Sequence, residues 1–156
     1  MFKLKKEIKS KNGIVHFRRW SIMSTKWFNI YIHCIYKPDE DKNLHDHPWD
    51  FCSIILKGTY TEQISVINDE DILLKIPSKY LPTKKINRHP FSIVYRKSHV
   101  PHKILHILNS KPVWTLVITN TKNREWGYIG DNGWINHLEY RKEKNEKNNF
   151  PGCIKL

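Results

Sequence analysis

Two histidines one residue apart, His45 and His47, and a distant third, His102, are the residues of this chain most suited to metal chemistry. Side chains two positions apart on an extended chain point to the same side, so His45 and His47 can reach one ion. A third imidazole can reach that ion from a distant strand. Imidazole suits Fe, Zn, Mn and Ni, and three protein ligands leave coordination positions open for water or substrate. The pattern predicts one divalent metal ion in a catalytic type of site.

Glu62 lies in a strand-like run that follows Gly58, where the even-numbered side chains are otherwise apolar. This alternation places Glu62 on the face that we expect to be buried. A buried carboxylate is costly unless it is paired or bound to a cation. Glu62 is therefore a candidate fourth metal ligand or a general acid or base. The alternative is a glutamate at the rim of a barrel that is paired with an arginine or a lysine.

Five further side chains are candidates for substrate binding: His33, Tyr60, Arg96, His106 and Arg124. His33 shares a predicted strand face with other side chains that could line a cavity, and His106 shares the face of His102 if that strand continues. Tyr60 lies on the same face as Glu62. Arginines near aromatic residues bind anions well, although ordinary strand edges show the same pattern. Packing roles for these residues stay open.

Short strands separated by turn residues make up most of the sequence. The predicted strands are residues 14–22, 26–36, 48–57, 59–67, 71–76, 91–96, 103–108, 113–119, 126–129 and 134–140. The last two flank Asp131-Asn132-Gly133, a hairpin signal. Residues 77–90 hold three prolines and predict an irregular basic loop. This many short strands predict an all-β fold, a closed or nearly closed antiparallel barrel or jelly roll.

One domain is the expectation for 156 residues. Residues 14–140 are predicted to form the barrel, between a basic N-terminal segment, 1–13, and a basic polar tail, 141–156, whose residues 141–149 we expect to be frayed. The three cysteines have no C-x-x-C spacing, which argues against a disulfide framework or a cysteine zinc site. No apolar leader or membrane-length run occurs, so we expect a soluble cytoplasmic protein without membrane contact.

The formal net charge of +12 favours anionic partners. A small ligand that carries phosphate or carboxylate is the first expectation. Nucleic acid bound through the basic ends is a weaker hypothesis, because no recognised nucleic-acid motif is present. The lysine-rich ends are also consistent with ordinary solvated tails.

The segment from Leu44 to Phe51, followed by Gly58, resembles the first motif of the cupin superfamily, in which H-x-H precedes a glutamate and then a glycine. His102 resembles the single histidine of the second cupin motif. The resemblance implies a double-stranded β-helix over residues 14–140, with a metal held by the three histidines. The sequence around these motifs also resembles that of small, often phage-encoded, single-domain cupins. Phe51 or Cys52 stands where the motif glutamate is expected, so Glu62 is a candidate replacement from the next strand.

The function that this resemblance implies is a metal-dependent cupin enzyme acting on a small anionic substrate. Iron would imply oxygenase chemistry, and zinc or manganese would imply hydrolysis, isomerisation or lyase chemistry. The alternative is a non-catalytic cupin that sequesters a nucleotide or sugar nucleotide, which in a phage would act as counter-defence. By analogy with other cupins, a homodimer through strand edges is also expected.

Overall fold

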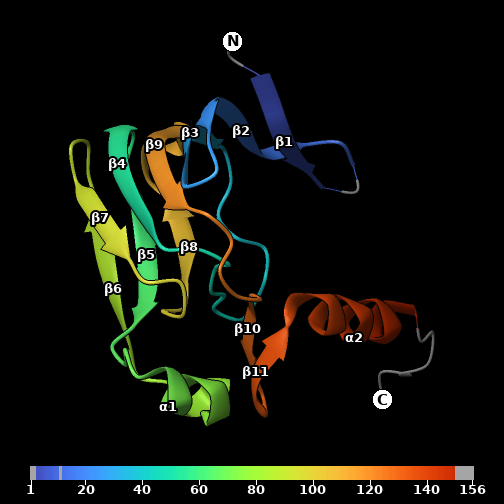
Figure 1. Ribbon diagram of the computed structural model, residues 1–156. Helices are drawn as coiled ribbons and strands as arrows, with labels where there is room; N and C mark the ends of the chain where they lie inside the picture. Colours follow the sequence, from blue (N-terminus) through green and yellow to red (C-terminus); the bar gives the residue numbers. More distant parts are fainter. Residues whose placement is uncertain (1–2, 11, 150–156) are drawn as a thin grey trace.

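The computed structural model describes residues 3–10 and 12–149 of the chain (Figure 1). Its strands are β1 (Lys3–Lys9), β2 (Val15–Ser24), β3 (Phe28–Ile35), β4 (Phe51–Lys57), β5 (Tyr60–Ser65), β6 (Thr83–Arg88), β7 (Ile93–Arg96), β8 (His102–Ile107), β9 (Val113–Asn120), β10 (Gly127–Gly130) and β11 (Gly133–Asn136). Its helices are α1 (Glu70–Lys75) and α2 (His137–Asn149), with 3-10 turns at Ser78–Tyr80 and Leu108–Ser110.

The strands form two antiparallel sheets. The larger sheet has the order β1-β2-β3-β9-β4-β7, and the second contains β6-β5-β8 together with the β10-β11 hairpin. His45 joins the two parts of the second sheet, because it forms single bridges to His102 of β8 and to Tyr128 of β10. Some neighbours in the larger sheet are far apart in sequence, since β9 lies between β3 and β4. This arrangement confirms the predicted all-β, single-domain jelly roll.

Two groups of apolar side chains form the core. The first lies between the sheets and consists of Ile35, Ile55, Tyr60, Val94 and Val113. The second joins α1 to the β10-β11 hairpin and consists of Leu44, Leu73, Leu81 and Ile129. Gly58 makes the turn between β4 and β5 at a φ of +82°, and a Cβ there would lie 2.8 Å from the carbonyl oxygen of Pro112. Only glycine fits that turn without strain.

Three segments differ from their predicted secondary structure. Residues 70–75 form a helix rather than a strand, because Asp69 caps its N-terminus by accepting a hydrogen bond from the Ile72 amide. The proline-containing stretch 77–90 is not wholly irregular, since residues 83–88 form β6 and pair with β5. Residues 141–149 continue α2 instead of fraying.

Long-range ring stacking explains why α2 forms despite its polar sequence. The Tyr140 ring stacks on Tyr128 at 4.0 Å between centroids, and His137 stacks on Trp126 at 4.4 Å. Lys144 also pairs with Asp41 at 2.6 Å. Tertiary contacts of this kind override weak helix propensity, and the local sequence does not reveal them. Neither described helix has the length and apolar character needed to cross a membrane.

The N-terminal hairpin extends the larger sheet beyond the two-layer body (Figure 1). Residues 3–9, which we placed outside the barrel, form β1 and pair with β2. Cys34 and Cys52 are free thiols, and Cys153 lies outside the described residues.

Candidate metal centre

The three histidines meet where the segment 44–47 runs between β8 and β10. The amide of His45 donates to the carbonyl of His102 at 3.0 Å, and the His102 amide donates back to His45 at 2.9 Å. The His47 amide donates to the Ser98 carbonyl at 3.0 Å. These backbone hydrogen bonds hold the segment that carries His45 and His47 against the strand that carries His102.

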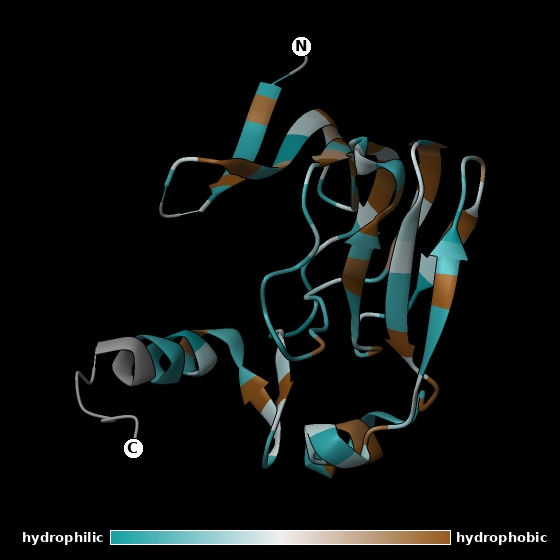
Figure 2. Ribbon diagram, turned by 180° about the vertical axis from the view of Figure 1, so that it is seen from behind, coloured by the Kyte–Doolittle hydropathy of each residue, from teal (hydrophilic) through white to brown (hydrophobic). Residues whose placement is uncertain are grey.

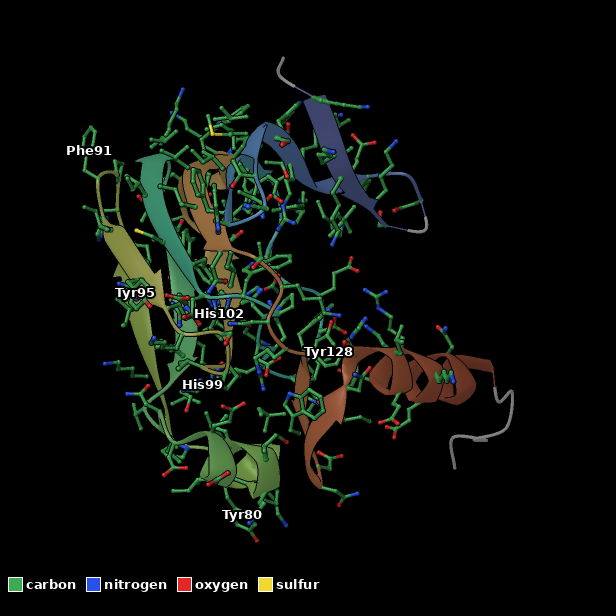
Figure 3. The ribbon with its side chains drawn as sticks, in the orientation of Figure 1. Tyr80, Phe91, Tyr95, His99, His102 and Tyr128 are labelled. Carbon is green, nitrogen blue, oxygen red and sulfur yellow. The ribbon has the colours of Figure 1, made fainter. Side chains whose placement is uncertain are left out.

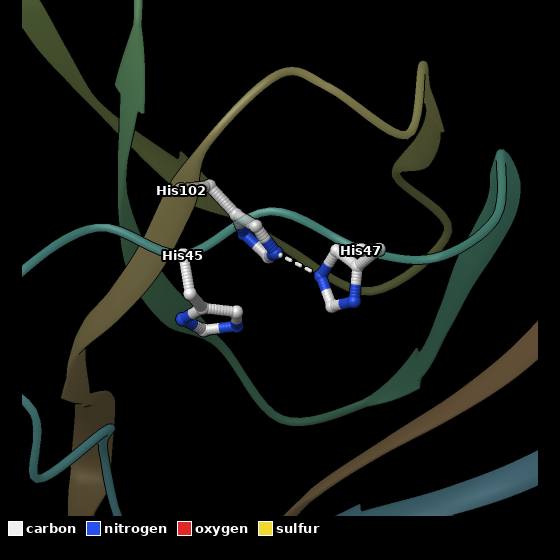
Figure 4. A group of neighbouring side chains, drawn as sticks. All are labelled: His45, His47 and His102. Carbon is white, nitrogen blue, oxygen red and sulfur yellow. Dashed lines mark hydrogen bonds between the residues drawn. The ribbon is translucent and has the colours of Figure 1, made fainter. Parts of the chain in front are cut away.

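One ligand nitrogen from each of His45, His47 and His102 lies within 4.8 Å of the other two. Nε2 of His47 and Nε2 of His102 are 2.8 Å apart, and the three rings converge on one space (Figure 4). The predicted metal-ligand triad is therefore assembled, with all three side chains partly buried. Imidazole nitrogens at these separations are the donor set expected for a transition metal.

Glu62 lies behind His102 rather than among the ligand atoms. Its Oε1 is 2.6 Å from Nδ1 of His102, on the side of the ring opposite the Nε2 atom that faces His47. A carboxylate there favours the proton on Nδ1 and leaves the Nε2 lone pair free to bind a metal. The residues present thus fit a metal ion, and Glu62 orients a ligand.

Two arginines bind the same carboxylate. Nη2 of Arg96 lies 2.5 Å from Oε1 of Glu62, and Nε of Arg88 lies 3.0 Å from Oε2. Burial alone would raise the pKa of Glu62, but the hydrogen bond from His102 and the charges of His102, Arg96 and Arg88 lower it to about 2. A carboxyl group with this pKa is a poor general acid or base near neutral pH. The arginine-paired interpretation is the one that the structure favours.

Asp46, which our sequence analysis did not single out, fixes the segment that carries two of the ligands. Its side chain is 1% exposed and accepts hydrogen bonds from the Gly127 amide at 2.6 Å, Trp134 Nε1 at 2.9 Å and Arg124 Nη1 at 2.5 Å. The residue between two histidines of an extended segment must point away from them. That alternation is the signal that could have identified Asp46 as a buried anchor.

Burial keeps the imidazoles of His47 and His102 neutral. It lowers the pKa of His47 well below the usual value, with smaller contributions from the charges of His102, His45, Arg96 and Arg19. Burial and then the charge of Arg96 lower the pKa of His102 to about 4, against the opposing effect of Glu62. Neutral imidazole is the form that binds a metal.

These shifts predict that metal-free protein loses stability on mild acidification. The folded pKa values lie below the unfolded value of 6.5, so the unfolded chain binds more protons and stability falls as pH drops from 6.5 toward 4. Between pH 7 and pH 5 the loss is about 2 kcal/mol for His102 alone. Urea unfolding of chelator-treated protein at the two pH values measures it. The His102→Gln variant should show a smaller difference, and equal wild-type stabilities would contradict the assignment.

Aromatic rings surround the triad. Phe51 lies 5.1 Å from the His47 ring and 6.0 Å from the His102 ring, measured between centroids. On the other side, Trp126 and Tyr128 lie 6.4 Å and 5.9 Å from the His45 ring. Phe51 is one of the two positions, with Cys52, at which the resembling motif would place a glutamate, and its phenyl ring packs against the triad.

Arg96 and His33, two of the predicted substrate-binding residues, lie on the inner face of the larger sheet. Arg96 is 3% exposed, and its Nε and Nη1 atoms are buried without a hydrogen-bond partner among the described residues. His33 accepts a hydrogen bond at Nε2 from Nε of Arg19 at 2.9 Å. Both remain candidates for contact with a ligand inside the barrel.

The other three candidates lie elsewhere. Tyr60 is 6% exposed within the hydrophobic core. Arg124 is already bound to Asp46 and to Glu70, so its guanidinium has a structural partner at each Nη atom. His106 is exposed on the outer face.

A bulge in β8 explains the position of His106. Glu62 pairs with Ile104 whereas Thr61 pairs with His106, so Leu105 is an extra residue in this strand. One inserted residue reverses the face of every side chain that follows it. Our prediction that His106 shares the face of His102 is therefore wrong.

Comparison with known proteins found similarity in structure only. No protein-family model and no curated protein matches the sequence. Three solved structures with the same fold are the iron(II) form of HppE, a cupin-2 domain protein of Rhodospirillum rubrum, Rru_A2000, and oxalate decarboxylase OxdC of Bacillus subtilis in its S161A form.

The identities to these structures are 10%, 12% and 11%, and the TM-scores are 0.54, 0.54 and 0.53. The alignments cover 76%, 80% and 80% of this chain, and 56%, 73% and 30% of the respective structures. The chain thus spans little more than half the length of HppE. This likeness, together with the two-sheet topology, shows that the chain has the cupin fold, a double-stranded β-helix.

Proposed function

We propose that this protein is a metal-dependent enzyme that acts on a small anionic substrate inside the barrel. The observation that carries the proposal is the triad of His45, His47 and His102, whose ligand nitrogens converge within 4.8 Å. The same fold in HppE, solved with iron(II), and in oxalate decarboxylase is consistent with it. The triad would hold one ion of Fe, Zn, Mn or Ni.

The preference for an anion rests on the charges that face the triad. Arg96 has two buried nitrogen atoms without an acceptor among the described residues, and its Cζ lies 5.8 Å from the centroid of the Phe51 ring beside His47. A carboxylate or phosphate oxygen would satisfy N–H groups that are otherwise costly to bury. Arg19 adds a second positive charge near His47.

The protein side chains have separate tasks in this proposal. A bound metal ion would polarise a substrate oxygen or activate water or dioxygen, according to the element. Glu62 holds the proton at Nδ1 of His102, which fixes the ligand ring. Phe51 and Trp126 cover two sides of the triad and limit the access of water. Arg96 would bind and orient the end of the anionic substrate that lies beside the triad.

Turnover by metal-loaded protein tests the proposal. The protein is loaded in turn with Fe(II), Zn, Mn and Ni and incubated with small carboxylates, sugar phosphates and nucleotides, with and without oxygen, and products are identified by mass spectrometry. We expect conversion of at least one anionic compound by wild-type protein and by Lys42→Ala, an exposed change in the same loop, but not by His45→Ala. Compounds that bind and are recovered unchanged with every metal would instead support a sequestering protein.

A further inference from the structure

Two adjacent arginines on β2 have opposite surroundings. Arg18 points to the outer face, where its Nε lies 2.6 Å from the Glu7 carboxylate. Arg19 points to the inner face, and within the described part of the chain it has no carboxylate partner. A half-buried cation without a counter-ion carries a desolvation cost that an anion would offset. The contrast indicates that the partner of Arg19 comes from outside the chain.

Arg19 is held in a fixed orientation. Its guanidinium carbon lies 4.9 Å from the centroid of the Tyr31 ring, 5.7 Å from Phe17 and 5.8 Å from Trp49. Its Nε donates to His33, so the two terminal nitrogens are the ones left without a partner among the described residues. A guanidinium that is packed between rings and bonded at Nε presents a preformed pair of donors, which suits two oxygens of one anion.

The position of Arg19 relates it to the metal centre. Trp49 follows His47 by two residues, and its ring lies beside Arg19. Arg19 and Arg96 are both among the charges that act on His47. The surrounding inner face holds the buried polar side chains of Ser53, Thr115 and Thr119 beside apolar ones such as Ile55. Positive charge and hydroxyl groups on this part of the inner face suit a bound anion.

We propose that Arg19, oriented by His33 and Tyr31, is the residue that binds a terminal carboxylate or phosphate group of the substrate. This inference rests on the proposed function for its biological meaning, but the anion site itself does not need the metal. The substrate is then a small molecule with one group near the three histidines and an oxyanion at the β2–β3 side of the barrel.

Anion binding to metal-free protein tests the site separately from catalysis. Titration calorimetry with inorganic phosphate and with malonate is carried out on chelator-treated wild-type protein, Arg19→Gln, Arg19→Lys and the matched control Arg18→Gln. We expect Arg19→Gln to weaken binding of one of the two anions tenfold or more, with Arg18→Gln unchanged and Arg19→Lys intermediate. The preferred anion distinguishes phosphate from carboxylate. Equal binding by the two glutamine variants, or no binding by wild-type protein, would overturn the assignment, and neither result depends on metal.

A separate observation concerns the outer face of the larger sheet. Two cross-strand rows on this face are wholly uncharged. One row is Tyr95, Cys52, Ile118, Ile30 and Met23, and the next is Ile93, Ile54, Leu116, Ile32, Trp20 and Leu4. Ile93 is 68% exposed and Tyr95 64%, whereas the intervening Val94 is buried. Apolar residues recur along these strands in Figure 2, and Tyr95 is labelled on β7 in Figure 3.

An antiparallel sheet with one solvated face normally places its polar side chains there. The outer face of this sheet departs from that rule, because two of its cross-strand rows are uncharged and mostly apolar. An apolar face of this extent marks an interaction surface. The second row crosses all six strands at about 4.8 Å spacing, and same-face residues lie about 7 Å apart along a strand. The two rows thus cover roughly 400 Å², about half of the ~800 Å² that a standard interface buries per partner.

We propose that a second copy of this chain covers this face. In a two-fold dimer the same surface meets itself, so a face that carried like charges would repel its copy. On a chain of net charge +12, these uncharged rows are a surface that can meet itself without that repulsion. The predicted homodimer would then form through a sheet face instead of strand edges.

Light scattering of the full chain during size exclusion measures the assembly. We expect wild-type protein at twice the 18.8 kDa chain mass, and the Ile93→Glu/Tyr95→Glu variant at the single mass with an unchanged circular dichroism spectrum. Tyr80→Glu, a 64% exposed position outside these rows, should leave the dimer intact. A monomeric wild-type protein, or a dimeric double variant, would overturn the proposal.

Discussion

Glu62→Gln is expected to destabilise the protein by about 3–5 kcal/mol, because it leaves the buried Arg96 and the half-buried Arg88 without their counter-charge. Glu62 and Arg96 have side chains that are 1% and 2% exposed, so solvent cannot replace the lost carboxylate. Glutamine has the size of glutamate and keeps one acceptor oxygen, so the variant removes the charge without changing the packing. Urea unfolding of metal-free protein measures the effect.

The same variant should bind metal about 10 to 100 times more weakly, because the amide holds the His102 ring less firmly in its ligand orientation. Glu125→Gln is the matched control, since Glu125 is exposed and pairs with Lys122 on the surface. We expect no measurable change in that variant. If Glu62→Gln were as stable as Glu125→Gln, the buried network would not have the role assigned to it.

Asp46→Ala should be the second large loss. It removes the acceptor of three hydrogen bonds, from the Gly127 amide, Trp134 and Arg124, and leaves buried donors unsatisfied. Breaking a buried charge pair of this kind costs about 3–5 kcal/mol. Because His45 and His47 flank Asp46, the change should also weaken metal binding. Unfolding and metal titration of one sample measure both effects.

Lys42→Ala provides the comparison, because Lys42 is exposed and lies three residues before His45 in the same segment. Its stability and metal affinity should equal those of wild-type protein. An Asp46→Ala protein that bound metal with unchanged affinity would show that the β10-β11 hairpin does not position the ligands.

The triad was predictable because two of its histidines follow the two-residue alternation of an extended chain and all three resemble a known motif. His45 and His47 share a face on any extended backbone, and the resemblance to a cupin motif pointed to His102 as their partner. The role of Glu62 was open, since burial predicts that a carboxylate needs a partner but not which one. Only the pairing of β5 with β6 and β8 shows that Arg88 and His102 approach it.

Other features depend on contacts that have no local signal. The single extra residue at Leu105 reverses His106, and a strand pattern read without its partner does not reveal a bulge. α2 depends on Tyr140 meeting Tyr128 across the fold. Arg19 and Arg18 are equivalent in sequence, and their opposite surroundings follow only from the pairing of β2 with β1 and β3.

The measurement that tests the central claim most directly is the metal content of the full chain, purified without chelators or a histidine-containing tag and then titrated with Fe(II), Zn, Mn and Ni. We predict close to one equivalent of a divalent metal per chain, lost in His47→Ala/His102→Ala but retained in Lys42→Ala. An absence of metal and of uptake in wild-type protein, or full retention in the double variant, would contradict a three-histidine metal centre.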